Sequence, residues 1–385
     1  MSANKPELFS IGYIKGLDIL RFIAATGVVI HHISYGLAQN HKVTTPFLSY
    51  HLDSGAFFLN LFFVISGFLI SAILFKELDT GKFNIKNFFV RRILRIWPLY
   101  FFVIIAYNII LPLVMNTGKI ADILYNVFFA SLFITNFQAI FYTIHKSTYL
   151  ILWSVGIEEQ IYLIFPFIML FFKSKRIMMA GLLTLIGLLS WIYIPDLITS
   201  PNGYNAEYFF TLSYLYYFGI GCLLTFLIPK NGKSHKIDTL LLNPIFQLIV
   251  LILGFAYVFD VLDSPKLPKY FPLFVNGILP TYLIYCAVRG KLIINVLSDK
   301  VTKFLGNISY AMYLIHIQVI GLGMILTRKM NPETSHFVMY DLFLTIFTIA
   351  MTILLSGLLH KFIEKPFLKL KKRYTSISNK TIDEP

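Results

Sequence analysis

The first hydrophobic stretch of the chain carries side chains that are rare at membrane depth. Between residues 17 and 32 it holds Asp18, Arg21, His31 and His32 in an otherwise apolar run. A charged group near the middle of a membrane helix costs roughly 2.5 to 3.5 kcal/mol on insertion scales, so such groups usually serve a site. Histidine exchanges protons near neutral pH, and a guanidinium binds carboxylates or phosphates. The stretch therefore predicts acid–base or anion-binding chemistry.

Helical spacing sorts these side chains by face. At about 100° per residue, Arg21 and His32 return to nearly the same face, about 16 Å apart along the helix axis. Asp18 lies about 60° from Arg21 and is expected to pair with it. His31 points about 80° away from that line, so His32 is the better candidate for a functional residue. The alternative is that Asp18 and Arg21 anchor the helix end while both histidines only pack.

Two adjacent acids, Glu158 and Glu159, form a second candidate group about four residues inside a later hydrophobic stretch. Carboxylates at that depth need a cavity or a cationic partner, because exposure to lipid is costly. A glutamate beside a histidine can orient the imidazole and stabilise its protonated form. The candidate catalytic residues are therefore His32, Arg21, Glu158 and Glu159. The alternative is that the acids mark a helix start, where the helix dipole favours them.

A third group is basic and precedes a hydrophobic stretch. Arg91, Arg92 and Arg95 stand at positions i, i+1 and i+4 where a predicted helix enters the membrane, and Lys86 lies one turn earlier. Planar guanidinium groups suit a phosphorylated anion, which they bind through two parallel hydrogen bonds. Ordinary anchoring of a basic cytoplasmic loop explains the same residues without any ligand.

Polar side chains inside other hydrophobic stretches are weaker candidates for contacts with a substrate. Asn60 and Ser66 are possible liners of a channel, although small residues at helix contacts usually serve packing. Tyr313 and His316 lie in the predicted span 304–326, where a hydrogen-bonded core position is the alternative. The histidines lack the close spacing with carboxylates of a metal site, so no metal is expected.

Composition places these groups in a membrane protein. Of 385 residues, 57% are hydrophobic and only 14% charged, and the mean hydropathy of +0.72 is far above the soluble range. The net charge of +14 lies mainly in short loops between apolar runs of about 20 residues. Membrane topology therefore explains the basic residues better than a nucleic-acid partner.

The predicted fold is an all-α integral membrane protein with about ten transmembrane helices and one re-entrant or interfacial helix at 121–136. If 121–136 crossed the membrane, every later loop would invert and the basic loop 173–176 would lie outside, against the positive-inside rule. Both termini are then cytoplasmic. The expected organisation is a terminus at 1–13, a membrane domain at 14–368 and a disordered basic tail at 369–385. The spans are predicted at 14–36, 55–76, 97–114, 154–172, 177–194, 208–228, 244–262, 271–288, 304–326 and 337–360.

Motifs in series carry a resemblance to a known family. In matching order from about residue 14 to 370, the chain resembles the acyltransferase-3 family of integral membrane acyltransferases, of the surface-polysaccharide O-acetyltransferase type. The motifs are Leu17-Asp18-x-Leu20-Arg21 with His32, Phe62-Phe63-Val64-Ile65-Ser66-Gly67, Arg91-Arg92-x-x-Arg95-Ile96-x-Pro98, Trp153-Ser154-x-x-x-Glu158-Glu159-Gln160-x-Tyr162, Ile308-Ser309-Tyr310-x-x-Tyr313-Leu314-x-His316 and Ile363-Glu364-Lys365-Pro366-Phe367.

The resemblance implies acyl transfer in a multi-pass protein of a bacterial inner or plasma membrane. The donor would be cytoplasmic acetyl-CoA, and the acceptor a hydroxyl of a surface glycan or a lipid-linked sugar. By this likeness Arg21 and His32 are the essential pair, and Arg92 and Arg95 help to hold the donor. The competing class is an exporter of polysaccharide or small molecules without chemistry, since buried charges also mark transport paths.

The topology and the resemblance together suggest a mechanism. Arg91, Arg92 and Arg95, with Lys86, would bind the phosphates of coenzyme A at the cytoplasmic side. His32, oriented by Glu158 or Glu159, would act as general base on the acceptor hydroxyl or as a transient acyl carrier.

Overall fold

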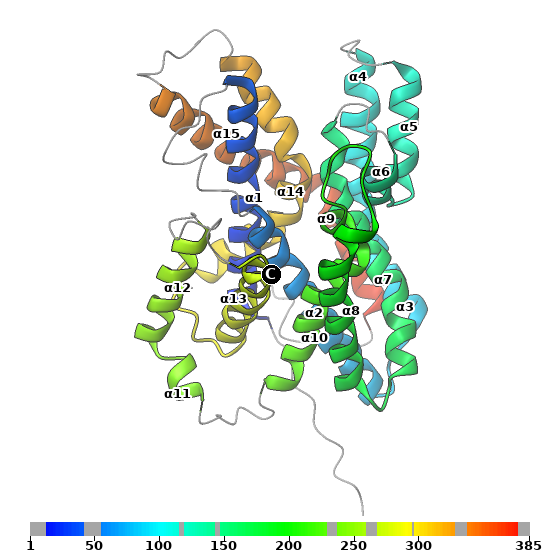
Figure 1. Ribbon diagram of the computed structural model, residues 1–385, viewed down its shortest axis with the longest axis vertical. Coiled ribbons are helices and arrows are strands. Elements are labelled where there is room, and N and C mark those ends of the chain that lie inside the picture. The colour runs from blue at the N-terminus through cyan, green and yellow to red at the C-terminus, as the bar shows by residue number, and fades with distance from the viewer. Residues whose placement is uncertain are drawn as a thin grey trace, which may run out of the picture.

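The computed structural model describes residues 13–41, 55–114, 119–142, 147–228, 237–258, 268–294, 296–327 and 337–375. Within these residues all regular structure is helical, as predicted (Figure 1). In chain order the α-helices are α1 (Lys15–His41), α2 (Gly55–Asp79), α3 (Ile85–Val103), α4 (Leu111–Val114), α5 (Ile120–Ser131), α6 (Thr135–Phe141), α7 (Trp153–Phe171), α8 (Arg176–Leu197), α9 (Ala206–Phe209), α10 (Leu215–Leu227), α11 (Asp238–Leu241), α12 (Pro244–Val258), α13 (Phe271–Val288), α14 (Asp299–Thr327), α15 (Phe337–Leu359) and α16 (Lys365–Lys371).

The number of membrane-spanning helices differs from the prediction. Among the described residues, 7 helices are long and apolar enough to cross a membrane, so the expected count of about ten is not confirmed. Two other predicted spans correspond to shorter apolar helices, Thr211–Leu227 and Pro244–Val258. The predicted span 97–114 is spread over α3, a π-helical segment and α4. Hydropathy detects an apolar run but not the length of regular helix within it. That length decides whether the helix can span the membrane.

The segment predicted as re-entrant or interfacial is sharply bent. Helices α5 and α6 meet at 119°, which is the geometry of a broken span or a re-entrant loop. The bend passes through Phe133, a non-glycine residue with a φ of 59°. The Gln160 side chain of α7 donates a hydrogen bond to the Phe133 carbonyl at 2.7 Å. Helix α7 therefore satisfies backbone that the bend leaves without a helical partner, as a buried bend requires.

Several helices expose continuous apolar faces. Only 22% of the most apolar window of α8 is buried, and large aliphatic and aromatic side chains cover its outer face. Large apolar side chains also cover the outer face of α12. Soluble proteins rarely leave such continuous apolar surfaces uncovered, whereas hydrocarbon covers them without cost. The chain therefore fits a multi-pass membrane protein. Exposed examples are Ile177, Leu185, Leu189, Tyr193, Ile245, Ile252 and Phe255.

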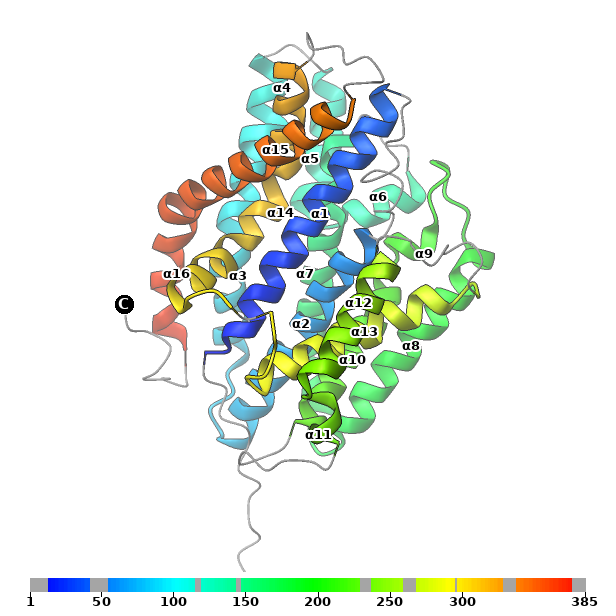
Figure 2. The ribbon, with the colours of Figure 1, turned by 90° about the vertical axis from the view of Figure 1, so that its left-hand side faces the viewer.

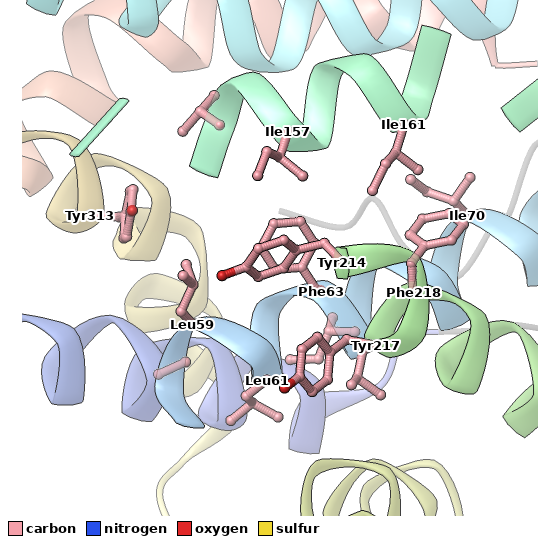
Figure 3. Close-up of a cluster of buried hydrophobic side chains, with 14 of the residues drawn as sticks. Leu59, Leu61, Phe63, Ile70, Ile157, Ile161, Tyr214, Tyr217, Phe218 and Tyr313 are labelled. Carbon is pink, nitrogen blue, oxygen red and sulfur yellow. The ribbon is translucent and has the colours of Figure 1, made fainter. Parts of the chain in front are cut away.

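Helix α2 is central to the core and packs against α1, α10 and α13. Figure 3 shows Phe63 of α2 beside Tyr214, which lies just before α10, with Ile157 and Ile161 of α7 on their other side. The Phe63 and Tyr214 ring centroids are 4.4 Å apart. Gly67 allows this close crossing, because a Cβ there would overlap a backbone carbonyl at the start of α10.

Helix α1 is positioned by α14, which runs alongside it (Figure 2). Gly306 of α14 faces Asp18, and a Cβ at this glycine would overlap the Asp18 side chain. Because Gly306 has no side chain, the Asp18 carboxylate can pack directly against the α14 backbone, and this contact positions the charged turn of α1. The position of Arg21 follows from this contact through its pairing with Asp18.

The last span continues beyond the expected end of the membrane domain. After a π-helical turn at His360–Glu364, α16 runs to Lys371 and a 3₁₀ turn to Tyr374. Helix α16 packs against α3. The first residues of the segment predicted as a tail are thus helical and docked, while 376–385 lie outside the described residues.

Candidate active site

A cavity of about 160 Å³ runs along one face of α2. Its α2 residues recur at helical spacing, and from Leu59 to Ile73 the helical rise gives a length of about 21 Å. The cavity is therefore an elongated channel between helices. Its other walls come from α1, α3, α7, α14 and α16, which contribute Arg21, Arg92, Arg95, Ile96, Ser154, Val155, Glu158, Tyr162, Ser309, Tyr310, Tyr313 and Lys371.

One end of the cavity is strongly cationic, with Arg21, Arg92, Arg95 and Lys371 in its wall. Arg21 pairs with Asp18 at 2.9 Å, so the predicted pairing is confirmed. The Arg92 guanidinium lies over the Tyr162 ring, 5.3 Å from its centroid. Among the described residues, Arg92, Arg95 and Lys371 form no ion pair with a carboxylate. Arg95 and Lys371 therefore offer positive charge to a ligand, as an anion site requires, and Arg92 is shared with the nearby Glu158.

The middle of the cavity holds a short hydrogen-bonded chain. Tyr162 donates from its hydroxyl to Ser66 Oγ at 3.0 Å, and Ser66 donates to Glu158 Oε1 at 3.0 Å. Glu158 also interacts electrostatically with Arg92. The carboxylate thus has both the cavity and the cationic neighbour that its depth demands. Ser66, predicted to contact a substrate, and Glu158, predicted to be catalytic, both line the cavity.

The opposite end of the cavity adjoins a pair of histidines. Tyr313 lines the cavity, and its ring centroid lies 5.7 Å from that of His316. His316 Nε2 lies 3.1 Å from His32 Nδ1. The structure therefore brings together His32, Tyr313 and His316, which sequence reasoning had placed in two separate candidate groups. His32 itself lies beside the cavity rather than in its wall.

Hydrogen-bond chemistry assigns the protons of this pair. His316 Nδ1 is 2.6 Å from the Tyr313 carbonyl, which only accepts, so this nitrogen carries the hydrogen. In the neutral ring Nε2 then accepts, and it faces His32 Nδ1. The latter also lies 3.0 Å from the Val28 carbonyl, so its single N–H is shared between these two acceptors. The lone pair of His32 is therefore on Nε2, which leaves that nitrogen ready to take a proton.

The two glutamates do not orient His32. Among the described residues, its hydrogen-bond partners are Val28 and His316. Glu159 Oε2 accepts a hydrogen bond from Trp97 Nε1 at 2.8 Å, and its other carboxylate oxygen is buried without a partner. The side chain that contacts the His32 ring is His316 rather than the predicted Glu158 or Glu159, because α14 packs against α1 here.

Three other predicted site residues lie outside the cavity wall. Arg91 is buried in an ion pair with Glu77 at 2.9 Å and donates to the Tyr374 carbonyl at 3.0 Å. Adjacent residues on a helix point about 100° apart, so Arg91 and Arg92 cannot face the same space. Lys86 is exposed on the first turn of α3. Asn60 is 2% exposed, and its side-chain oxygen has no partner.

We expect Arg91→Gln to lower the stability of the protein rather than only its ligand affinity. The substitution removes the guanidinium that pairs with the buried Glu77 carboxylate, and breaking a buried ion pair costs roughly 3 to 5 kcal/mol. Thermal unfolding in detergent should give a clearly lower midpoint for Arg91→Gln. Arg95→Gln is the matched control, because Arg95 is exposed on the same helix, and its midpoint should stay at that of the wild type. Equal midpoints for both variants would contradict the structural role of Arg91.

Sequence reasoning omitted Ser154, Tyr162 and Lys371 from the site. Ser154 and Tyr162 stand in the motif around Glu158 and share its helix face with helical spacing, which was the available signal. Ser154 contacts the Tyr313 hydroxyl at 2.6 Å. Lys371 gave no local signal, because it is one of several basic residues after the last span and only its packing against α3 brings it to the cavity.

The amino-acid sequence is similar to those of known proteins and to one family model. O-acetyltransferase OatA of Staphylococcus aureus strain NCTC 8325 / PS 47 is 28% identical over 384 residues, covering 94% of this chain and 58% of that protein. The protein of the same name from strain COL matches equally. The chain thus spans 58% of the length of these relatives. No solved structure matches. A family model described as an acyltransferase domain matches residues 14–360, so the chain belongs to the acyltransferase-3 family.

Proposed function

We propose that the chain is a membrane O-acyltransferase that moves an acyl group, acetyl by default, from cytoplasmic acyl-CoA to a hydroxyl of an extracytoplasmic or lipid-linked glycan. One observation carries the proposal: a single cavity along α2 leads from a cluster of cations to the wall beside the His32–His316 pair. A polyanionic donor and a proton acceptor are the two requirements of this reaction, and the cavity connects the sites that would meet them.

The cationic end suits the nucleotide of coenzyme A, whose phosphates carry several negative charges. Arg92 and Arg95 would bind these phosphates, and Arg21 would face the donor where the cavity deepens. The pantetheine arm would then lie along the apolar α2 wall, past Leu69 and Phe62. This assignment gives the cationic end a ligand and places the thioester toward the histidine end.

His32 supplies the base for the transfer step. Its Nε2 takes the proton of the acceptor hydroxyl as that oxygen attacks the thioester carbonyl. The C–O bond forms, the C–S bond breaks, and the coenzyme A thiolate leaves and takes up a proton to give the free thiol. His316 keeps the Nδ1 proton of His32 engaged, which holds the lone pair on Nε2. The chemistry needs no metal.

Orientation follows from the basic loops. If the N-terminus is cytoplasmic, the Arg21 end of α1 and the basic start of α3 face the compartment that contains acyl-CoA. The turn with His32 then lies toward the opposite side, where a surface glycan is built. Arg21 and His32, about 16 Å apart along α1, would thus serve donor and acceptor respectively.

Turnover of radiolabelled acetyl-CoA by the purified protein in liposomes tests the proposal. With a crude glycan extract present, the label should move to the glycan fraction and free thiol should appear in equal amount. Donor-independent flux of glycan with no consumption of acetyl-CoA or other acyl-CoAs would instead favour an exporter. Arg91→Gln, reconstituted at the same protein concentration, serves as a control. It shows how much turnover is lost when the protein is destabilised but Arg92, Arg95 and His32 are unchanged.

A further inference from the structure

The C-terminal segment Lys365–Tyr374 reaches the cationic end of the cavity from outside the bundle core. Helix α16 packs against α3, and the Lys371 side chain lies in the cavity wall together with Arg92 and Arg95. Its neighbours in sequence, Lys369 and Lys372, are exposed. One lysine of a basic segment is therefore turned inward while the adjacent ones face outward, as helical geometry allows.

The inward position of Lys371 brings its charge close to four other positive charges. Its charge interacts with those of Arg95, Arg92, Arg91 and Arg21. Like charges that share a partly enclosed space repel one another more strongly than in water, because the surroundings have a lower effective dielectric constant. An arrangement of this kind is relieved by a multivalent anion that contacts the cations together.

The segment is also fastened in place. The Arg91 guanidinium donates to the Tyr374 carbonyl at 3.0 Å while it pairs with Glu77 of α2 at 2.9 Å. This contact joins the end of the segment to the cytoplasmic ends of α2 and α3. Lys371 thus belongs to a segment whose end is hydrogen-bonded to Arg91, which is itself held in a buried ion pair.

We propose that the C-terminal segment completes the donor site, and that Lys371 is a specificity-determining residue that binds a phosphate of the coenzyme A nucleotide with Arg92 and Arg95. The inference rests on the proposed function for the identity of the donor. It adds that the cationic end is built from three parts of the chain, α1, α3 and α16, and is incomplete without the segment Lys365–Tyr374.

Equilibrium binding of adenosine 3′-phosphate 5′-diphosphate, the nucleotide part of coenzyme A, tests this without any turnover. The full chain in detergent is titrated at fixed low ionic strength, because salt screens these contacts. Lys371→Met should weaken binding about tenfold, the size of one charge-assisted hydrogen bond. Lys371→Arg should bind within about threefold of wild type, and Lys369→Met, the matched control in the same segment, should bind as the wild type does.

Each outcome decides the assignment. Wild-type affinity in Lys371→Met overturns it, and so does an equal loss in Lys371→Met and Lys371→Arg, since the charge would then not be what matters. Lys369→Met as weak as Lys371→Met would indicate general attraction by the basic segment and also overturn it. If the wild type and the three variants bind the nucleotide as expected but the wild type never consumes acyl-CoA, the proposed transfer is wrong while the anion site is supported. If acetyl-CoA is consumed, Lys371→Met should raise its KM about tenfold with little change in kcat.

Discussion

His32→Ala is expected to lower the rate of acetyl transfer by about 10³-fold, the middle of the range for loss of a general base. Alanine removes His32 Nε2, whose lone pair the hydrogen bonds of Nδ1 to Val28 and His316 leave free for a proton. The donor-binding end, more than two helical turns away, keeps its cations. Single-turnover transfer from labelled acetyl-CoA should therefore fall while nucleotide affinity stays within about twofold of the wild type.

His31→Ala is the matched control for that loss. His31 is the adjacent imidazole on α1, and its ring lies edge-on to that of His32 with centroids 5.1 Å apart. If His32 alone takes the proton, His31→Ala should keep transfer within about threefold of the wild type. Comparable losses in both variants, or transfer that persists in His32→Ala, would contradict the assignment.

A related measurement separates a general base from an acyl carrier. When labelled acetyl-CoA is added without an acceptor, a base leaves the protein unlabelled, whereas a carrier retains one acetyl group on the His32 ring. We expect no label after rapid denaturation. Label that depends on His32 would make the reaction a two-step transfer through an acyl-enzyme.

The charged turn of α1 shows how far local pattern determines a site. Helical spacing alone predicted that Asp18 and Arg21 pair, and they do, because both residues lie on one helix whose geometry is fixed. Composition and the length of the apolar runs gave the correct helical class, and the distribution of basic residues among the loops marked the segment that bends between α5 and α6. These features depend on spacing within one helix or on the composition of whole segments, and a sequence records both directly.

Contacts between distant helices were not predictable in this way. The contact between His32 and His316 joins residues of α1 and α14. Arg91, predicted to bind a ligand, forms an ion pair with Glu77 of α2 instead. Which helix packs against which turn depends on close contacts such as Gly306 against Asp18, and these follow from three-dimensional packing. The position of Lys371 at the cavity likewise depends on the docking of α16 on α3.

Ser66→Phe is expected to lower kcat/KM for acetyl transfer by about 10²-fold or more, because it obstructs the cavity between its two ends. Ser66 lines the cavity roughly midway along α2, with the cationic end on one side and Tyr313 on the other. A phenyl ring there would occupy the space that the pantetheine arm needs. Nucleotide affinity should stay near that of the wild type, since the phosphates bind before the obstruction.

Ser66→Ala separates obstruction from the loss of hydrogen bonds. Alanine removes the donor to Glu158 and the acceptor for Tyr162 but adds no volume, so its cost should stay within about tenfold. If transfer requires the thioester to travel along α2, Ser66→Phe must be far worse than Ser66→Ala while both bind the nucleotide. Equal activity of the two variants would mean that donor and acceptor meet elsewhere, and the link between the cationic end and His32 would have to be abandoned.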